Sequence, residues 1–141
     1  MFLGFGGLSW IGSLYADEVN VTLDFPSEIQ NGDGFEFTIS IANVSARTVK
    51  VESIDFSMNY LDGILIEDTK PPTTNIDQYD ALGGGETFQS FYFNESIAPN
   101  ETFIVIFYAK AIRAGDYNGT VDVCINLFFN CQNNVARTII K

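Results

Sequence analysis

Histidine is absent from this chain of 141 residues, and only seven lysines and arginines accompany 18 aspartates and glutamates. Without histidine the chain cannot form a Ser–His or Cys–His nucleophile, a histidine-ligated zinc site or an imidazole base. Most hydrolase mechanisms are thereby excluded. The net charge of −11 leaves no basic patch for nucleic acid or for anionic membrane surfaces. We therefore expect no nucleic-acid partner and an acidic, well-solvated surface.

Cysteine is also scarce, since the chain contains only Cys124 and Cys131. A metal site is excluded at this pair because no other soft ligands accompany it. The short spacing predicts a disulfide that clips the hairpin between the last two strands, and such a small loop should stabilise the fold by about 2.5 kcal/mol. Two free thiols are the alternative. Cys124 lies in the polar phase of its strand, so we expect it on the surface of the hairpin.

Tryptophan and methionine are rare, with one and two residues, whereas phenylalanine occurs 13 times and tyrosine six times. Aromatic side chains suit the pleated surface of a sheet. From Phe35 to Ile41 apolar and polar residues alternate without interruption, which is the period of a strand with one face in water and one on a core. We expect Phe35, Phe37, Ile39 and Ile41 to face that core.

The remaining chain reads as further short strands separated by glycine, proline and asparagine turns. Residues 69–85 form a long irregular stretch with two prolines and three glycines, which suits a crossing between sheets. The segment 103–111 is apolar in both phases at its start, as in a central strand with both faces covered. Seven or eight strands predict an all-β sandwich of two antiparallel sheets, with a closed barrel as the rival. The other strands are expected at 19–25, 49–59 with a bulge near Glu52-Ser53, 64–66, 88–93, 117–125 and 135–140, with a turn at 60–63.

Residues 1–16 form an uncharged apolar leader ahead of a domain at 17–141. The leader is too short for a membrane-spanning helix and resembles the core of a secretion signal ending at Ala16, although no basic residue precedes it. If the leader is retained, its side chains need cover from the domain itself, from lipid or from a neighbouring subunit. Docking into a neighbour would add a strand there and propagate a head-to-tail filament. The predicted assembly residues are Phe2, Leu3, Phe5, Leu8, Trp10 and Ile11.

The order of turn signals from about Val19 onward resembles the immunoglobulin-like domains of prokaryotic surface proteins of the CARDB or DUF11 type. The resemblance rests on residues 34–39, 43–45, 82–87, 97–102 and 114–117. It implies a two-sheet immunoglobulin-like sandwich that packs, spaces or adheres outside the cell and does not catalyse. Tyr117 resembles the tyrosine corner of such sandwiches. The chain departs from the immunoglobulin pattern because Cys124 is not placed to join the sheets through the core.

Asn-x-Ser/Thr triplets are frequent for a chain of this length, and none has proline in the middle. Asn20 and Asn118 fall in polar phases of strands, and the others fall at strand ends or turns, so we expect the exposure that glycans need. The alternative is that asparagine, serine and threonine simply concentrate in turns. The predicted glycosylation sites are Asn20, Asn43, Asn94, Asn100 and Asn118.

Weaker candidates remain around the loops. Asp62, Asp77 and Asp80 could bind Ca²⁺, but their spacing matches no known calcium loop, and solvated carboxylates are the simpler interpretation. Three tyrosines could stack on sugars, namely Tyr60, Tyr79 and Tyr92. We expect no metal, no cofactor and no enzymatic activity. The hypothesis is an extracellular or cell-surface structural module whose partners are copies of itself, other surface proteins or glycans, and which contacts a membrane only through residues 1–16. A carbohydrate-binding or adhesion module is the alternative.

Overall fold

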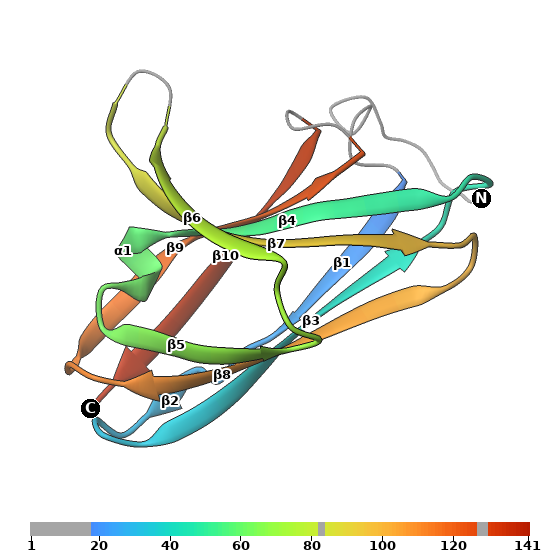
Figure 1. Cartoon of the computed structure of the whole chain (residues 1–141). Coiled ribbons are helices and arrows are strands. Elements are labelled where there is room, and N and C mark those ends of the chain that lie inside the picture. The colour runs from blue at the N-terminus through green and yellow to red at the C-terminus, as the bar shows by residue number, and fades with distance from the viewer. Residues whose placement is uncertain (1–17, 82–83, 127–129) are drawn as a thin grey trace, which may run out of the picture.

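The computed structural model describes residues 18–81, 84–126 and 130–141, and they form a sandwich of two packed sheets (Figure 1). The smaller sheet has the order β1 (Val19–Asp24), β3 (Gly34–Asn43), β8 (Thr102–Ala111) and β5 (Ile64–Lys70). The larger sheet has the order β2 (Glu28–Ile29), β10 (Cys131–Ile140), β9 (Gly115–Ile125), β4 (Val49–Ser57), β7 (Thr87–Ile97) and β6 (Asn75–Asp80). The sandwich is confirmed over the rival barrel, and the described residues form ten strands in place of the seven or eight expected.

Strand β3 places its apolar phase in the core as the alternation predicts. Phe37, Ile39 and Ile41 are at most 1% exposed, and Phe35 is half-buried at the rim. The Phe37 ring stacks on Phe107 of β8 with 5.0 Å between centroids. Aromatic rings of the larger sheet complete the cluster from the other side, and the core is therefore filled by facing strands of both sheets.

The predicted bulge in β4 is confirmed. The pairing of β4 with β7 and with β9 shifts register between Val51 and Ser53. An extra residue lets a strand change phase, so Val51 before the bulge and Ile54 after it both face the core. After β4 the chain makes a single helical turn, α1 (Met58–Leu61), where the sequence predicts a turn at 60–63.

The prediction of an irregular stretch over residues 69–85 is wrong in part. Strand β5 continues to Lys70, and β6 (Asn75–Asp80) pairs in antiparallel register with β7. Strand β6 is polar and lies at the edge of its sheet, where backbone pairing needs little apolar burial. Alternation gives no signal for such a strand. The crossing between sheets is confirmed, because β5 belongs to the smaller sheet and β6 to the larger one.

The expectation that 103–111 is covered on both faces is also wrong. Val105, Phe107 and Ala109 face the core, whereas Ile104 is 52% exposed on the outer face. Strand β8 is central within its sheet, but the sheet has only one packed face. A strand that has a neighbour on each side in its sheet can therefore still have one face exposed to solvent.

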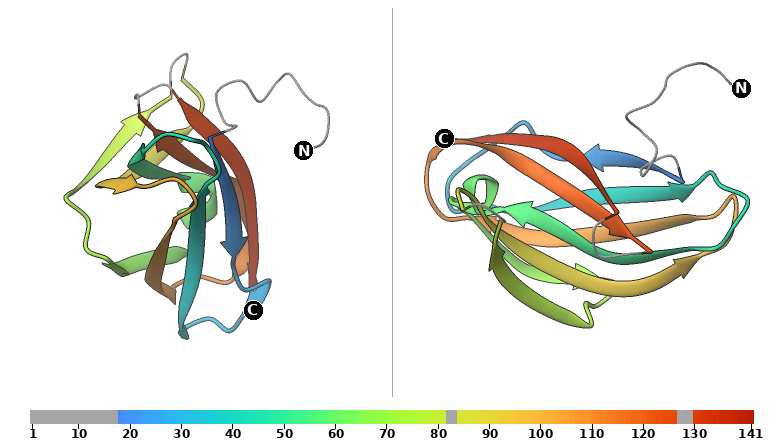
Figure 2. Two further views of the ribbon diagram at one scale, coloured as in Figure 1. Left: turned by 90° about the vertical axis from the view of Figure 1, so that its right-hand side faces the viewer. Right: turned by 90° about the horizontal axis from the view of Figure 1, so that it is seen from above.

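The start of the domain joins the two sheets at one side. Strand β1 pairs with β3, and after Pro26 the chain moves to the larger sheet, where β2 runs parallel to the end of β10. Figure 2 shows β1 and β10 passing along the same side of the sandwich. The Thr138 hydroxyl donates to the Pro26 carbonyl at 2.7 Å, and the Ile139 amide donates to Ser27 at 2.9 Å. These bonds fix the transfer between sheets.

Tyr117 forms the corner that the resemblance implies. Its ring is buried, and its hydroxyl lies 2.9 Å from the Arg113 carbonyl and 3.0 Å from the Ala114 carbonyl, donating to this pair. The ring occupies the space in which a Cβ on Gly63 would stand. Gly63 is therefore required for close approach of the α1–β5 turn to the tyrosine.

The predicted disulfide is present between Cys124 and Cys131, which stand directly opposite each other on β9 and β10. The phase prediction for Cys124 is correct, because it alternates with the core residues Val123 and Ile125. The expected exposure is wrong, since Cys124 is only 3% exposed. The outer face of the larger sheet is therefore covered at this point by neighbouring side chains.

Candidate functional site on the outer face of the larger sheet

Four of the five predicted glycosylation sites carry exposed asparagines. Asn20 lies on β1, Asn94 on β7, Asn118 on β9, and Asn100 in the β7–β8 turn. Asn94 and Asn100 have positive φ angles of 51° and 68°, which asparagine tolerates well. Exposure is the condition that the prediction requires, and glycosylation at these four positions stays a prediction.

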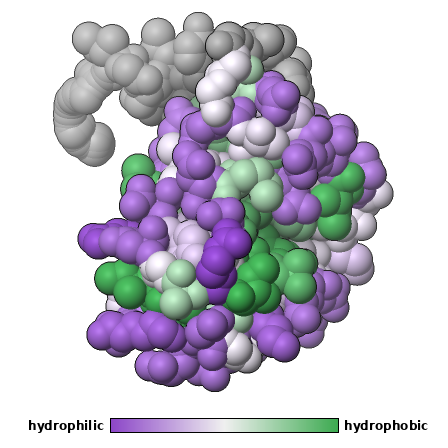
Figure 3. Space-filling model, turned by 90° about the vertical axis from the view of Figure 1, so that its left-hand side faces the viewer, coloured by the Kyte–Doolittle hydropathy of each residue, from purple (hydrophilic) through white to green (hydrophobic). Residues whose placement is uncertain are grey.

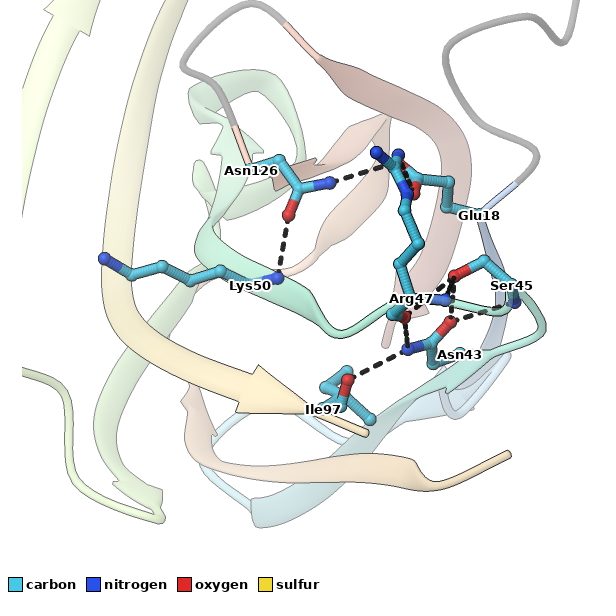
Figure 4. A network of polar contacts seen from close by, with 7 residues as sticks. All are labelled: Glu18, Asn43, Ser45, Arg47, Lys50, Ile97 and Asn126. Atoms are coloured by element: carbon cyan, nitrogen blue, oxygen red, sulfur yellow. Dashed lines mark hydrogen bonds and ion pairs between the residues drawn. The ribbon is translucent and has the colours of Figure 1, made fainter. Parts of the chain in front are cut away.

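Asn43 does not meet that condition. Its side chain is 1% exposed, and its Nδ2 donates to the Ile97 carbonyl at 2.9 Å and to the Arg47 carbonyl at 2.8 Å. Its Oδ1 accepts from both the backbone and the side chain of Ser45 (Figure 4). A glycan on Nδ2 would replace one of two buried donors and would have no path to solvent. The inclusion of Asn43 among the exposed sequons is therefore wrong, because its polar strand end folds inward.

The same network fixes the first described residue. Arg47 forms an ion pair with Glu18 at 2.6 Å, and the Asn126 side chain donates to Glu18 at 3.0 Å. The Lys50 amide in turn donates to Asn126 at 2.9 Å. The start of the domain is thus tied to the β3–β4 turn and the end of β9 (Figure 4). The predicted assembly residues Phe2, Leu3, Phe5, Leu8, Trp10 and Ile11 lie outside the described residues.

A polar row crosses the outer face of the larger sheet. Asp55 of β4 is paired in register with Ser90 of β7 on one side and with Asp122 of β9 on the other. Asp77 of β6 extends the row beyond Ser90, and Asn133 of β10 extends it beyond Asp122. The two central members are unusually buried for an outer face, with Asp55 3% and Ser90 1% exposed.

Tyr79 covers the middle of this row from the edge strand β6. Its hydroxyl donates to Asp55 Oδ2 at 2.9 Å, and its ring stacks on Phe88 with centroids 5.6 Å apart. Burial, with the Asp55 carboxylate beside it, raises the pKa of the Tyr79 phenol well above its usual value. The phenol therefore stays a hydrogen-bond donor at physiological pH. Ser90 Oγ lies close to the Tyr79 phenol, and this contact opposes the rise in the Tyr79 pKa, although Ser90 Oγ makes no well-formed hydrogen bond to any described residue.

Asp122 shares the row with a second partner. Its Oδ1 accepts from Asn133 Nδ2 at 2.7 Å. Burial raises the pKa of the Asp122 carboxyl, and the nearby charges of Asp55 and Glu86 raise it further, against the opposing effect of the Asn133 hydrogen bond. Asp55 Oδ1 is buried without a hydrogen-bond partner among the described residues. Two carboxyls thus stand side by side with one oxygen lacking a donor.

The other candidates from the sequence are dispersed. Asp62 pairs with Arg113, and Asp80 accepts from Thr87 at 2.8 Å. Within residues 18–81, 84–126 and 130–141, no three acidic, histidine or cysteine side chains converge as metal ligands do. The predicted Ca²⁺ alternative therefore has no site at these loops in the described part of the chain.

The three tyrosines considered for sugar stacking separate into two groups. Tyr60 is fully buried in the core, where its hydroxyl lies 2.9 Å from Thr138 Oγ1, and burial raises its pKa to about 12. Tyr79 and Tyr92 both lie on the outer face of the larger sheet and are half-buried. Only these two remain available to a ligand at that face.

A small pocket of about 130 Å³ opens at the side of the sandwich between the edge strands β5 and β6. Its apolar lining includes Ile66, Ile76 and the core residue Phe91. Leu65 on β5 is 49% exposed and Ile76 on β6 is 50% exposed. Figure 3 shows apolar patches among polar surface on the side of the molecule that lies at the left of Figure 1, where α1 and the C-terminus are. In the part of the chain that the structure describes, no helix has the length and hydropathy to cross a bilayer.

No protein-family model matches the chain, and no curated protein does. Among solved structures, the chain is similar to AvmM, which catalyses macrocyclisation in alchivemycin A biosynthesis, with 10% identity, coverage of 86% and 89% of the two chains, and a TM-score of 0.56. It is also similar to the cupredoxin domain of amoB from Nitrosocaldus yellowstonii, with 8% identity, coverage of 87% and 84%, and a TM-score of 0.51.

A CARDB domain from Pyrococcus furiosus matches over 89% of this chain and 90% of its own, with 12% identity and a TM-score of 0.45. The likenesses to AvmM and to the cupredoxin domain, with TM-scores of 0.56 and 0.51, agree with the β-sandwich fold described above. At such identities they establish the fold alone, because unrelated functions share it. Membership in the CARDB or DUF11 families stays a prediction.

The cross-strand pair of buried Asp55 and half-buried Asp122 is the feature that sequence reasoning missed. Ser53, Asp55 and Ser57 alternate with core residues, so they read as a solvated face. All three are less than 5% exposed. One signal could have found them, which is the cross-strand alignment of two aspartates in the middle of neighbouring long strands.

Proposed function

We propose that the chain is an extracellular, non-catalytic structural or interaction module of a cell surface or appendage. The observation that carries the proposal is the disulfide between directly opposed positions of β9 and β10, because such bonds persist in oxidising compartments. Four exposed sequons on three strands and one turn support the same location. An acidic surface and the scarcity of lysine and arginine agree with a solvated module.

The proposal extends to self-assembly through residues 1–16. The edge strands β5 and β6 flank a small pocket whose lining is partly apolar, and they carry exposed Leu65 and Ile76. An added strand gains main-chain hydrogen bonds from an open sheet edge and specificity from pockets for alternate side chains. The uncharged leader of a neighbouring copy has the composition for this edge, and each subunit would offer its own leader to the next. The product is a head-to-tail filament.

Deletion of residues 1–16 tests the assembly. The core is closed by residues from Val19 onward, so the truncated chain should keep the circular dichroism of the full chain and sediment as a monomer. In the full chain, Ile76→Lys should lower the polymerised fraction, whereas Val135→Lys on β10, at a position 76% exposed, should not. Polymers that persist after the deletion, or a native N-terminus at Asp17, would contradict assembly and leave the extracellular module standing.

A carbohydrate-binding module is the second candidate, and the arrangement of Tyr79 and Tyr92 favours it. Both lie on the same outer face, beside the hydroxyl and carboxyl groups of the polar row. Aromatic rings next to such groups suit the apolar faces and hydroxyls of sugars. Tyr92→Ala should then abolish glycan retention on an array while the protein stays folded. Loss of retention with Tyr108→Ala, on the other sheet, would count against this face.

A further inference from the structure

The outer face of the larger sheet holds two carboxyls that face each other across neighbouring strands. Asp55 and Asp122 are partners in the antiparallel register of β4 and β9, and the Cβ atoms of such partners are about 5 Å apart in general. Asp55 is 3% exposed and Asp122 is half-buried. Two negative charges so close and so poorly hydrated repel strongly, and in such pairs one pKa rises.

The groups that pack around the pair supply no compensating positive charge. Strand β7 contributes Ser90, β6 contributes Tyr79 and Asp77, and β10 contributes Asn133. The nearby charge from the segment before β7 is Glu86, which is also acidic. The described outer-face positions in register with the pair hold no lysine or arginine. The surroundings therefore raise the free energy of the doubly ionised state.

Hydrogen bonding leaves one place for a proton. Asp55 Oδ2 accepts from the Tyr79 hydroxyl, and Asp122 Oδ1 accepts from Asn133. Asp55 Oδ1 is buried and has no donor among the described residues. An unpaired buried acceptor is unfavourable, and a proton on Asp122 that is donated to Asp55 Oδ1 would remove both this cost and one of the two charges. Two carboxyls and one hydroxyl are too few ligands for Ca²⁺.

We propose that Asp122 holds a proton and donates it to the unpartnered Asp55 Oδ1, so that the two side chains form an acid-stabilised lock on the outer face of the larger sheet. The proton comes from solvent, sits on the Asp122 carboxyl and changes the charge of the pair from −2 to −1. The neutral Tyr79 phenol completes the lock by holding β6 to β4 across β7.

The direction of the pH dependence follows from linkage. The pKa of the Asp122 carboxyl in the folded state is raised above its ordinary value of 3.8, first by burial and then by Asp55 and Glu86. The folded state therefore binds the proton more tightly than the unfolded state. The stabilisation is complete below pH 3.8 and is lost as the pH rises through the folded-state value. This trend is opposite to that of an aspartate held ionised by an ion pair.

Asp55→Asn and Asp122→Asn test the lock in the full chain, because each amide imitates a protonated carboxyl and keeps an oxygen for Tyr79 or Asn133. Asp24→Asn on exposed β1 is the matched control with the same change of net charge. At pH 7 each lock variant should raise the melting temperature about 4 °C more than the control. Below pH 4 this advantage should disappear. Lock variants that match the control at both pH values would overturn the proposal.

Infrared spectroscopy keeps the test decisive if an amide disturbs the packing. At about pH 5, more than one unit above the ordinary pKa of aspartate, the wild type should show a protonated carboxyl band. The band should persist in Asp24→Asn and vanish in both lock variants. Absence of this band from the wild type at pH 5 would mean that Asp122 is ionised at that pH, as a bridging water would allow, and would refute the proposal.

Discussion

The contact between Gly63 and Tyr117 allows a sharp test of how the corner of the sandwich is built. A Cβ placed on Gly63 would overlap the Tyr117 ring and would stand 2.5 Å from its hydroxyl oxygen. The ring is 7% exposed, and its hydroxyl is bonded to the Arg113 and Ala114 carbonyls. Gly63→Ala must therefore expel the ring or move the turn between α1 and β5.

The magnitude follows from what is lost. Removing a buried aromatic side chain from its site costs about 3–5 kcal/mol, and the corner hydrogen bond adds about 1 kcal/mol. Partial relaxation of the turn should recover some of the lost free energy, so we expect Gly63→Ala to destabilise the domain by about 3–4 kcal/mol. Gly34→Ala is the matched control, because its Cβ would only touch the Ala109 carbonyl at 3.8 Å. We expect less than about 0.5 kcal/mol for that change.

Urea unfolding followed by circular dichroism gives the free energy of unfolding for each variant. A double-mutant cycle with Tyr117→Ala isolates the clash, because Gly63→Ala should be nearly silent once the ring is absent. An unfolding midpoint of Gly63→Ala equal to that of the wild type would refute the steric argument. Equal losses in the Tyr117→Ala background would show that the glycine is needed for its backbone and not for the ring.

Three further predictions concern the disulfide, the sequons and Tyr79. Replacing both Cys124 and Cys131 by serine should lower the free energy of unfolding by about 2.5 kcal/mol; uptake of two thiol labels by native protein without reductant would show that the bond is absent. Intact mass of native protein should exceed that of the bare chain through glycans on at least two exposed sequons, and peptide mapping should find none on Asn43; a bare mass would contradict this. Tyr79→Phe should lower the free energy of unfolding by about 1 kcal/mol, because it leaves Asp55 without its donor. Because the Tyr79 pKa is raised in the folded state, the wild type should lose stability as the pH rises above the ordinary tyrosine value of 10.0, and Tyr79→Phe should lose less stability over the same range.

The sandwich could be predicted because its long strands have one buried face. The alternation in β3 and the change of phase in β4 are direct consequences of packing against a core. The edge strand β6 could not be predicted, because Asn75–Asp80 is mostly exposed and gains its structure from backbone pairing with β7. Whether the outer face of β8 is covered depends on how many layers the domain has, and the sequence of one strand does not show this.

The candidate site was harder to predict than the fold. Asp55 lies in a polar phase, and its burial results from Tyr79, which reaches it from a strand 24 residues further along the chain. Asn43 failed as an exposed sequon for a related reason, since its partner Ile97 lies 54 residues away. Phase along a strand predicts which face a side chain is on. Cover from distant segments then decides whether that face meets water.

Cryo-electron microscopy of native material tests the proposed function most directly. We predict filaments in which residues 1–16 of one subunit lie along the β5–β6 edge of the next, with additional density on the four exposed sequon asparagines. Isolated particles whose N-terminus is Asp17, or filaments held together without residues 1–16, would contradict assembly by leader donation.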